Sequence, residues 1–108
     1  MVFKKYFAVL LLVLANSNLP AYARKDCPTA TVRDIQVQEQ KVLYRQHGGP
    51  WRLLGVLNAE DGTKERYSAL LMAQASRALV EVGYVDDVYD CSAPDYSTPA
   101  IMLRTIVE

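Results

Sequence analysis

The stretch that decides the fold is Thr63-Lys-Glu-Arg-Tyr-Ser-Ala-Leu-Leu-Met-Ala-Gln-Ala-Ser-Arg-Ala-Leu-Val-Glu-Val-Gly-Tyr-Val85, because its hydrophobic period changes along its length. In its first part, apolar residues recur at spacings of three and four, which is typical of an amphipathic helix. Thr63 is predicted as the N-cap, and the Glu65 carboxylate would complement the helix dipole in the first turn. The predicted apolar stripe consists of Tyr67, Leu70, Leu71, Ala75 and Ala78.

The last part of the stretch predicts a strand. From Leu79 the hydrophobic period becomes two, with Val80, Val82 and Tyr84 on one side of the chain. The alternative is a helix that continues to Val82 and ends at Gly83, since glycine is common just past a helix C-terminus.

Three strands are predicted before the helix. Residues 32–38 alternate between polar side chains and an apolar face on Ile35 and Val37, and the pattern resumes at 42–44 after a turn or bulge at 39–41. His47-Gly-Gly-Pro50 interrupts the chain, because glycines supply positive φ and proline cannot continue a central ladder. Residues 51–57 then form the third strand of an antiparallel meander.

After the helix the chain predicts two more strands, one from Leu79 and one over 101–107, separated by a proline-containing loop at 92–99. The fold class is therefore mainly β with one helix (α+β), in the order strand, strand, strand, helix, strand, strand. Five strands in this order are typical of a small, partly open OB-like barrel, which limits the exposed edges of so short a chain. A plain α+β sandwich is the alternative.

The N-terminus has the organisation of a secretory signal peptide. Lys4 and Lys5 precede the apolar run Phe7-Ala-Val-Leu-Leu-Leu-Val-Leu-Ala15, and Ala21-Tyr-Ala23 is a small-x-small cleavage site. The run is too short for a transmembrane helix, which needs about 20 apolar residues. We expect cleavage after Ala23, a secreted or periplasmic protein with no stable membrane anchor, and one domain over 24–108. The alternative is an uncleaved N-terminal anchor.

The two cysteines, Cys27 and Cys91, are expected to form one disulfide after export to an oxidising compartment. The chain-entropy model gives about 4 kcal/mol of stabilisation for a loop of this length. Free thiols or an intermolecular bridge are the alternatives.

The chain resembles the small secreted B-subunits of bacterial AB5 toxins, the cholera, pertussis and subtilase groups. The resemblance lies in the Ala-rich helix that runs into a Val-x-Val-x-Tyr strand over 65–84, in the ending with Cys91, Pro99 and Ile101-Met-Leu103, and in the disulfide. It implies an OB barrel and a homo-oligomeric ring that binds cell-surface glycans.

Composition and motifs argue against several other functions. The formal net charge is zero, so the basic footprint of a nucleic-acid binder is missing and no nucleic-acid partner is expected. His47 is the sole histidine, and no G-x-S-x-G elbow positions a serine beside it, so no enzyme is predicted. The acidic run Asp86, Asp87, Asp90 and Asp95 lacks the D-x-D-x-D-G register, and we expect a solvated loop with no metal and no cofactor.

The aromatic residues point to binding. All those after residue 23 are Trp or Tyr, which combine an apolar face with a hydrogen-bonding tip. Trp51, Tyr89 and Tyr96 are the candidate recognition residues, while the competing interpretation places Trp51, Tyr67 and Tyr84 in the core. The basic residues Arg33, Lys41, Arg45 and Arg52 are expected to face outward, as solubilising positions or as a modest positive patch.

These patterns predict an exported binding module that recognises a glycan or a protein partner, with a homo-oligomer like the AB5 B-subunits as one form. The alternative is a periplasmic structural or inhibitory protein that covers its partner with a strand edge or a helix.

Overall fold

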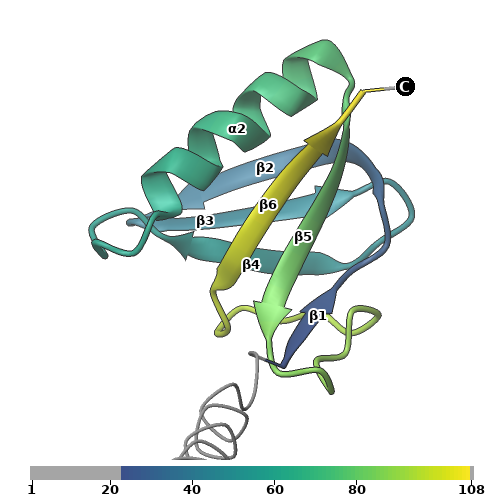
Figure 1. The fold of residues 1–108 in the computed structure, drawn as a ribbon. Coiled ribbons are helices and arrows are strands. Elements are labelled where there is room, and N and C mark those ends of the chain that lie inside the picture. Colours follow the sequence, from purple (N-terminus) through teal and green to yellow (C-terminus); the bar gives the residue numbers. More distant parts are fainter. Residues whose placement is uncertain (1–22, 108) are drawn as a thin grey trace, which may run out of the picture.

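The computed structural model describes residues 23–107, and the predicted signal peptide therefore lies outside the described residues except for Ala23. One helix and six strands follow one another along this part of the chain (Figure 1). Their bounds are β1 Arg24–Asp26, β2 Ala30–Gln38, β3 Lys41–Gln46, β4 Trp51–Val56, α2 Thr63–Ser76, β5 Leu79–Val85 and β6 Ala100–Ile106. The predicted mainly β class with one helix, and the order of the five predicted strands around it, are confirmed.

All six strands belong to one antiparallel sheet in the order β1-β5-β2-β3-β4, with β6 paired to β5. β6 pairs with β5 from Leu79 to Tyr84, while β1 and β2 share the opposite edge of β5. The short strand β1 was not predicted, because Arg24, Lys25 and Asp26 carry no hydrophobic alternation. It forms through pairing with distant residues of β5, a contact that local sequence does not encode.

The sheet is not closed, so the predicted barrel is not confirmed. β4 and β6 would have to pair to close it. Instead, the outer edge of β4 pairs with the loop before β6: Leu53 N–H donates to Asp95 O (2.9 Å) and Asp95 N–H donates to Trp51 O (3.1 Å). This parallel bridge protects the start of β4 without completing a ladder.

The meander β2–β3–β4 is the predicted one. Its first turn contains Glu39 with φ 55°, and its second contains Gly48 with φ 76°, where glycine avoids the strain of the left-handed region. β2 runs from a pair with Gln46 to a pair with Lys41 along β3, with a bulge near its start.

Helix α2 begins one residue earlier than predicted. Gly62 is the N-cap with φ 91°, and Thr63 is the first helical residue rather than the cap. The capping acceptor is Asp61, whose Oδ1 accepts from the Thr63 N–H (3.1 Å) and the Thr63 hydroxyl (2.6 Å). The Thr63 side chain is fully buried against Gly55 of β4, where a Cβ would overlap it. Packing therefore moves Thr63 from the cap position into the helix.

The helix ends at Ser76, with Arg77 in the left-handed conformation as its C-cap. The alternative helix to Val82 is wrong, because Val80 and Val82 are fully buried in β5. The apolar stripe is also rotated from its predicted position: Thr63, Leu70 and Ala73 are buried, whereas Leu71 is 40 % exposed. Packing against β6, β2 and β4 selects this side of the helix.

One hydrophobic core lies between α2 and the sheet. Two tyrosines are fully buried at its centre, and their hydroxyls share a hydrogen bond between Tyr44 and Tyr84 (2.8 Å). The other core residues are Cys27, Val32, Val42, Leu54, Leu70, Ala73, Val80, Val82 and Ala100.

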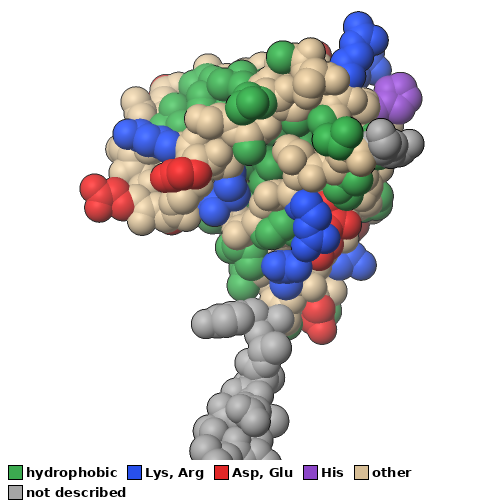
Figure 2. Space-filling view, turned by 45° about the horizontal axis from the view of Figure 1, so that its top comes forward, with side chains coloured by type: hydrophobic (Ala, Val, Ile, Leu, Met, Phe, Trp, Pro, Cys, Tyr) green, Lys and Arg blue, Asp and Glu red, His purple; other side chains and the backbone are tan. Residues whose placement is uncertain are grey.

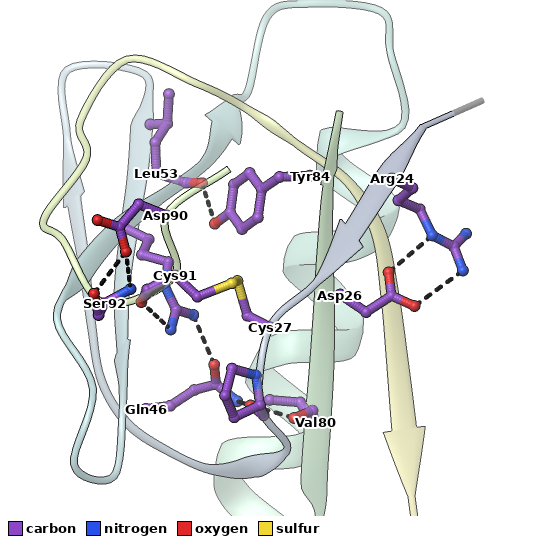
Figure 3. The surroundings of a disulfide bond; sticks show 12 residues. Arg24, Asp26, Cys27, Gln46, Leu53, Val80, Tyr84, Asp90, Cys91 and Ser92 are labelled. Atoms are coloured by element: carbon purple, nitrogen blue, oxygen red, sulfur yellow. Dashed lines mark hydrogen bonds and ion pairs between the residues drawn. A yellow bond between two sulfur atoms is a disulfide. The ribbon is translucent and has the colours of Figure 1, made fainter. Parts of the chain in front are cut away.

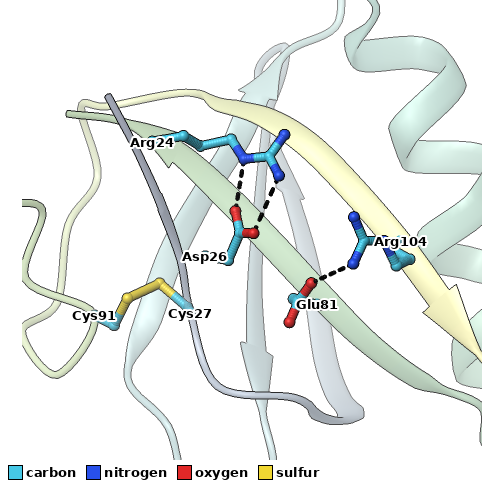
Figure 4. A network of polar contacts seen from close by, with 6 residues as sticks. All are labelled: Arg24, Asp26, Cys27, Glu81, Cys91 and Arg104. Carbon is cyan, nitrogen blue, oxygen red and sulfur yellow. Dashed lines mark hydrogen bonds and ion pairs between the residues drawn. A yellow bond between two sulfur atoms is a disulfide. The ribbon is translucent and has the colours of Figure 1, made fainter. Parts of the chain in front are cut away.

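The disulfide between Cys27 and Cys91 confirms the predicted pairing and joins the chain after β1 to the loop after β5 (Figure 3). Beside it, Arg24 and Asp26 form an ion pair (2.8 Å), and Glu81 of β5 pairs with Arg104 of β6 (3.0 Å) (Figure 4). The Asp26 carboxylate lies so close to Gly83 that a Cβ there would come within 2.7 Å of Oδ1. β1 is thus held by the disulfide, by backbone pairing and by close packing.

Within residues 23–107, α2 is too short and too polar to cross a membrane.

Candidate functional site

The outward side of β2, β3 and β4 carries a continuous set of polar and aromatic side chains, which we call the meander face. The register places Asp34 opposite Arg45, and Arg45 opposite Trp51. The next row has Gln36 opposite Leu43.

These positions alternate along β3 with the buried residues Val42, Tyr44 and Gln46, so they point away from the core. The meander face consists of Asp34, Gln36, Gln38, Lys41, Leu43, Arg45 and Trp51.

Trp51 is held at one end of this face. The Arg45 guanidinium lies over its ring at 5.2 Å from the centroid. Arg45 Nε in turn donates to Asp34 Oδ2 at 2.9 Å. Carboxylate, guanidinium and indole form a chain that restrains the Trp51 ring, which remains half-buried.

Tyr96 lies at the other end of the face and is 51 % exposed. It lines a cavity of about 310 Å³ together with Gln38, Glu39, Lys41 and Leu43. Its neighbour Asp95 is fixed to the edge of β4, so the loop that carries Tyr96 has a defined position beside the sheet.

Asp95 also organises the loop around Tyr96. Although burial opposes its ionisation, hydrogen bonds from the Ser97 N–H (3.0 Å), the Ser97 hydroxyl (3.0 Å) and the Thr98 N–H (3.4 Å) lower the pKa of Asp95. The Tyr89 hydroxyl and Asp95 Oδ2 are both buried, and neither has a hydrogen-bond partner in the described part of the chain. Asp95 is therefore a charged anchor of the loop at neutral pH.

Tyr89, the third candidate, does not lie on the same surface. Its ring stacks on Tyr84, with the centroids 4.1 Å apart and the planes 6° from parallel. The ring packs against the core, and its hydroxyl is buried, so burial raises the pKa of Tyr89. The structure thus brings Trp51 and Tyr96 to opposite ends of the meander face. Tyr89 lies instead beneath the loop that carries Tyr96.

The competing core interpretation holds for two of its three residues. Tyr84 is fully buried and Tyr67 packs against the core, whereas Trp51 lies on the meander face.

Arg52 differs from its predicted outward position, because it is only 3 % exposed. The break at Gly48 and Gly49 resets the alternation, so that Trp51 points outward and Arg52 points inward. Lys41 and Arg45 lie on the meander face as expected for outward positions.

The acidic loop uses its carboxylates within itself. Asp90 Oδ1 accepts from the Ser92 hydroxyl (2.6 Å) and the Ser92 N–H (2.9 Å), which lowers the pKa of Asp90. Over residues 23–107 no cluster of three or more His, Cys, Asp or Glu side chains is placed to hold a metal ion.

Sequence reasoning did not single out Gln36, Gln38 and Leu43 as site residues. Their signal is the polar alternation of residues 34–38, which was used only to predict a half-buried strand. The polar side of such a strand can face either solvent or a ligand. Only the position of Tyr96 beside this strand indicates a binding surface.

Comparison of the chain with protein-family models, with curated proteins and with solved structures finds no match.

Proposed function

We propose that this chain is an exported binding module that recognises a glycan through the meander face. The observation that carries the proposal is the cavity of about 310 Å³ between the exposed Tyr96 ring and the polar side chains Gln38, Glu39 and Lys41. An aromatic ring offers a flat apolar surface to the C–H side of a sugar, while amide, carboxylate and ammonium groups hydrogen-bond its hydroxyls.

The order of strand pairing supports an OB-like architecture for the module. β2 pairs with both β3 and β5, β5 pairs with β6, and the helix follows the third strand of the meander. A barrel of this kind requires only one further contact, between β4 and β6, and the bridge from β4 to Asp95 lies next to that position. This architecture is the one implied by the resemblance to AB5 toxin B-subunits.

Export is supported by two independent features. The disulfide is typical of proteins that fold in an oxidising compartment. Cleavage after Ala23 would also leave every described strand in the mature chain, since β1 starts at Arg24. We place the working protein in the periplasm or outside the cell.

The test is glycan binding by protein recovered after export of the full-length chain. A glycan array identifies ligands, and titration calorimetry then compares variants. Tyr96→Ala should weaken binding roughly tenfold or more, because it removes the stacking surface while leaving the core intact. Val88→Ala is the matched control, because Val88 is 78 % exposed and lies outside the meander face. Unchanged affinity in Tyr96→Ala combined with Trp51→Ala would refute the proposed face.

A second candidate function is association with a protein through β6. Within the described chain β6 pairs only with β5 and exposes Ile101, and it contacts a helix that exposes Leu71 and Met72. Figure 2, which brings the helix side forward, shows hydrophobic side chains in several patches across it. A free edge strand pairs readily with another chain, including a second copy of the same protein.

Light scattering separates the two candidates. A homo-oligomer that Ile101→Lys dissociates would support the β6 edge as an assembly surface. A strict monomer that captures no protein but binds a glycan would leave the meander face as the functional surface.

A further inference from the structure

A buried arginine without a carboxylate partner lies at the opposite end of β3 from the Tyr96 cavity. Arg52 is 3 % exposed, and no acidic side chain within residues 23–107 forms an ion pair with it. Its hydrogen-bond acceptors are the neutral oxygens of Tyr44, Gln46 and Cys91. Removing a cation from water without a compensating charge costs several kcal/mol.

The guanidinium is fixed by a buried amide. Gln46 Nε2 donates to Val80 O at 2.9 Å (Figure 3) and to Ala30 O at 3.2 Å. These bonds direct Gln46 Oε1 toward Arg52 Nη1, at 2.9 Å. Nη1 also donates to the Tyr44 hydroxyl at 3.3 Å. These contacts use both N–H groups of Nη1.

The other side of the guanidinium is only partly used. Nε and Nη2 both donate to Cys91 O, at 3.3 and 3.0 Å. Nη2 carries two N–H groups, so one N–H of Arg52 has no acceptor in the described part of the chain.

This free donor borders a cavity of about 330 Å³. Gly49 lies over Nη2, and a Cβ added to Gly49 would come within 3.6 Å of that nitrogen. His47 and Ser92 line the same cavity and are exposed at its margin. The missing Gly49 side chain therefore leaves space next to a fixed, buried positive charge.

We infer that this cavity is a binding site for a small carboxylate anion, one oxygen of which accepts a hydrogen bond from Arg52 Nη2. A carboxylate supplies the negative charge that the site lacks, and charge-assisted hydrogen bonds of this kind are about twice as strong as neutral ones. The site is separate from the meander face, so it does not depend on the proposed glycan function.

The experiment is a titration followed by ¹⁵N-resolved NMR, at constant ionic strength, on labelled protein recovered after export of the full-length chain. Acetate is the probe, acetamide is its neutral isostere, and inorganic phosphate is the alternative anion. We expect acetate to shift the amide signals of His47, Gly49 and Ser92 in a saturable way, and acetamide to leave them in place.

Gly49→Ala is the decisive variant, because its methyl group would fill the space beside Nη2 while meeting Arg52 and Gln46 only at ordinary van der Waals distance. It should weaken acetate binding about tenfold or more, the loss expected for one hydrogen bond to a charged group. Met72→Ala, on the exposed side of α2, is the matched control and should bind as the unmodified protein does.

Equal responses to acetate and acetamide, no response to either, or unchanged acetate affinity in Gly49→Ala would each overturn the inference. Tighter binding of phosphate than of acetate would overturn the assignment to a carboxylate. Arg52→Lys keeps the charge but loses the geometry of the guanidinium, so a folded Arg52→Lys protein that binds acetate normally would also contradict it.

Discussion

At the scale of single residues, the core depends on two buried hydroxyl groups. Tyr84 Oη lies 2.8 Å from Tyr44 Oη and donates to Leu53 O at 2.9 Å. The Leu53 N–H in turn donates to Asp95 O. Burial raises the pKa of Tyr44 and of Tyr84, so both hydroxyls stay protonated at neutral pH. The hydroxyl pair connects β3, β5 and β4 through the centre of the domain.

Tyr84→Phe should therefore lower the free energy of unfolding by about 1–3 kcal/mol, because it leaves the buried Leu53 carbonyl without its donor. Urea unfolding followed by circular dichroism measures the change. Tyr96→Phe is the control and should be neutral, since its hydroxyl lies on the surface. A Tyr84→Phe protein as stable as the control would show that the hydroxyl pair does not contribute.

At the scale of the elements, the helix is positioned by its first turn. Asp61 Oδ1 caps Thr63, and the Thr63 side chain is buried against Gly55 of β4. The hydrogen bonds from Thr63, together with the charge of Arg66, lower the pKa of Asp61, while partial burial opposes this shift. The start of α2 is thus stabilised by an ionised carboxylate.

This shift makes stability depend on pH in a defined direction. The unfolded state binds a proton at Asp61 near the ordinary value of 3.8, whereas the folded state binds it only at lower pH. The stabilisation is fully present above the unfolded pKa and is lost as the pH falls through the folded one.

We expect the urea midpoint of the protein to fall as the pH is lowered below about 4, and to fall less steeply in Asp61→Asn. The asparagine keeps the acceptor oxygen and loses only the titration. Asp90 and Asp95, whose pKa values are also lowered, leave part of the slope in place. Identical slopes in the two proteins would exclude Asp61 as a source of the pH dependence.

Element boundaries were predictable where local pattern and packing agree. The change of period at Leu79 and the turn at 47–50 both lie where the sequence indicates them. The exposure of Leu71 and the presence of β1 were not predicted, because both depend on contacts with residues that are distant in sequence. A helix with apolar residues on several sides can bury more than one stripe, and the side that β6 and β2 cover decides between them.

The candidate site was predictable only in part, because the positions of some of its residues depend on packing. Trp51 and Tyr96 were singled out by residue type, but the buried position of Tyr89 follows from its stack on Tyr84, five residues away along a loop. The inward position of Arg52 follows from the break in alternation at Gly48 and Gly49, which a period count across the turn does not detect.

At the scale of the whole molecule, the disulfide joins two segments that are distant in sequence. Cys27 and Cys91 are 64 residues apart, and the Cys91 carbonyl also accepts two of the hydrogen bonds from Arg52. The loop between β5 and β6 is also held against the sheet by the Asp95 bridge, by the Tyr89 stack and by a hydrogen bond from the Asp86 N–H to Ala23 O (2.9 Å).

Replacing both cysteines by alanine should lower the free energy of unfolding by about 2–5 kcal/mol. The loss should be accompanied by increased amide hydrogen exchange in residues 86–99, because the loop is released. Hydrogen exchange with mass spectrometry, with the oxidised protein as reference, measures both effects. Unchanged exchange in this loop would mean that the noncovalent contacts alone are sufficient to hold it.

NMR shift mapping of the labelled protein, with a glycan selected from the array, shows whether the meander face is the recognition surface. We expect the perturbed amide signals to cluster at Gln38, Lys41, Leu43 and Tyr96. Perturbations confined to β5 and β6, with the meander face unchanged at saturation, would contradict it.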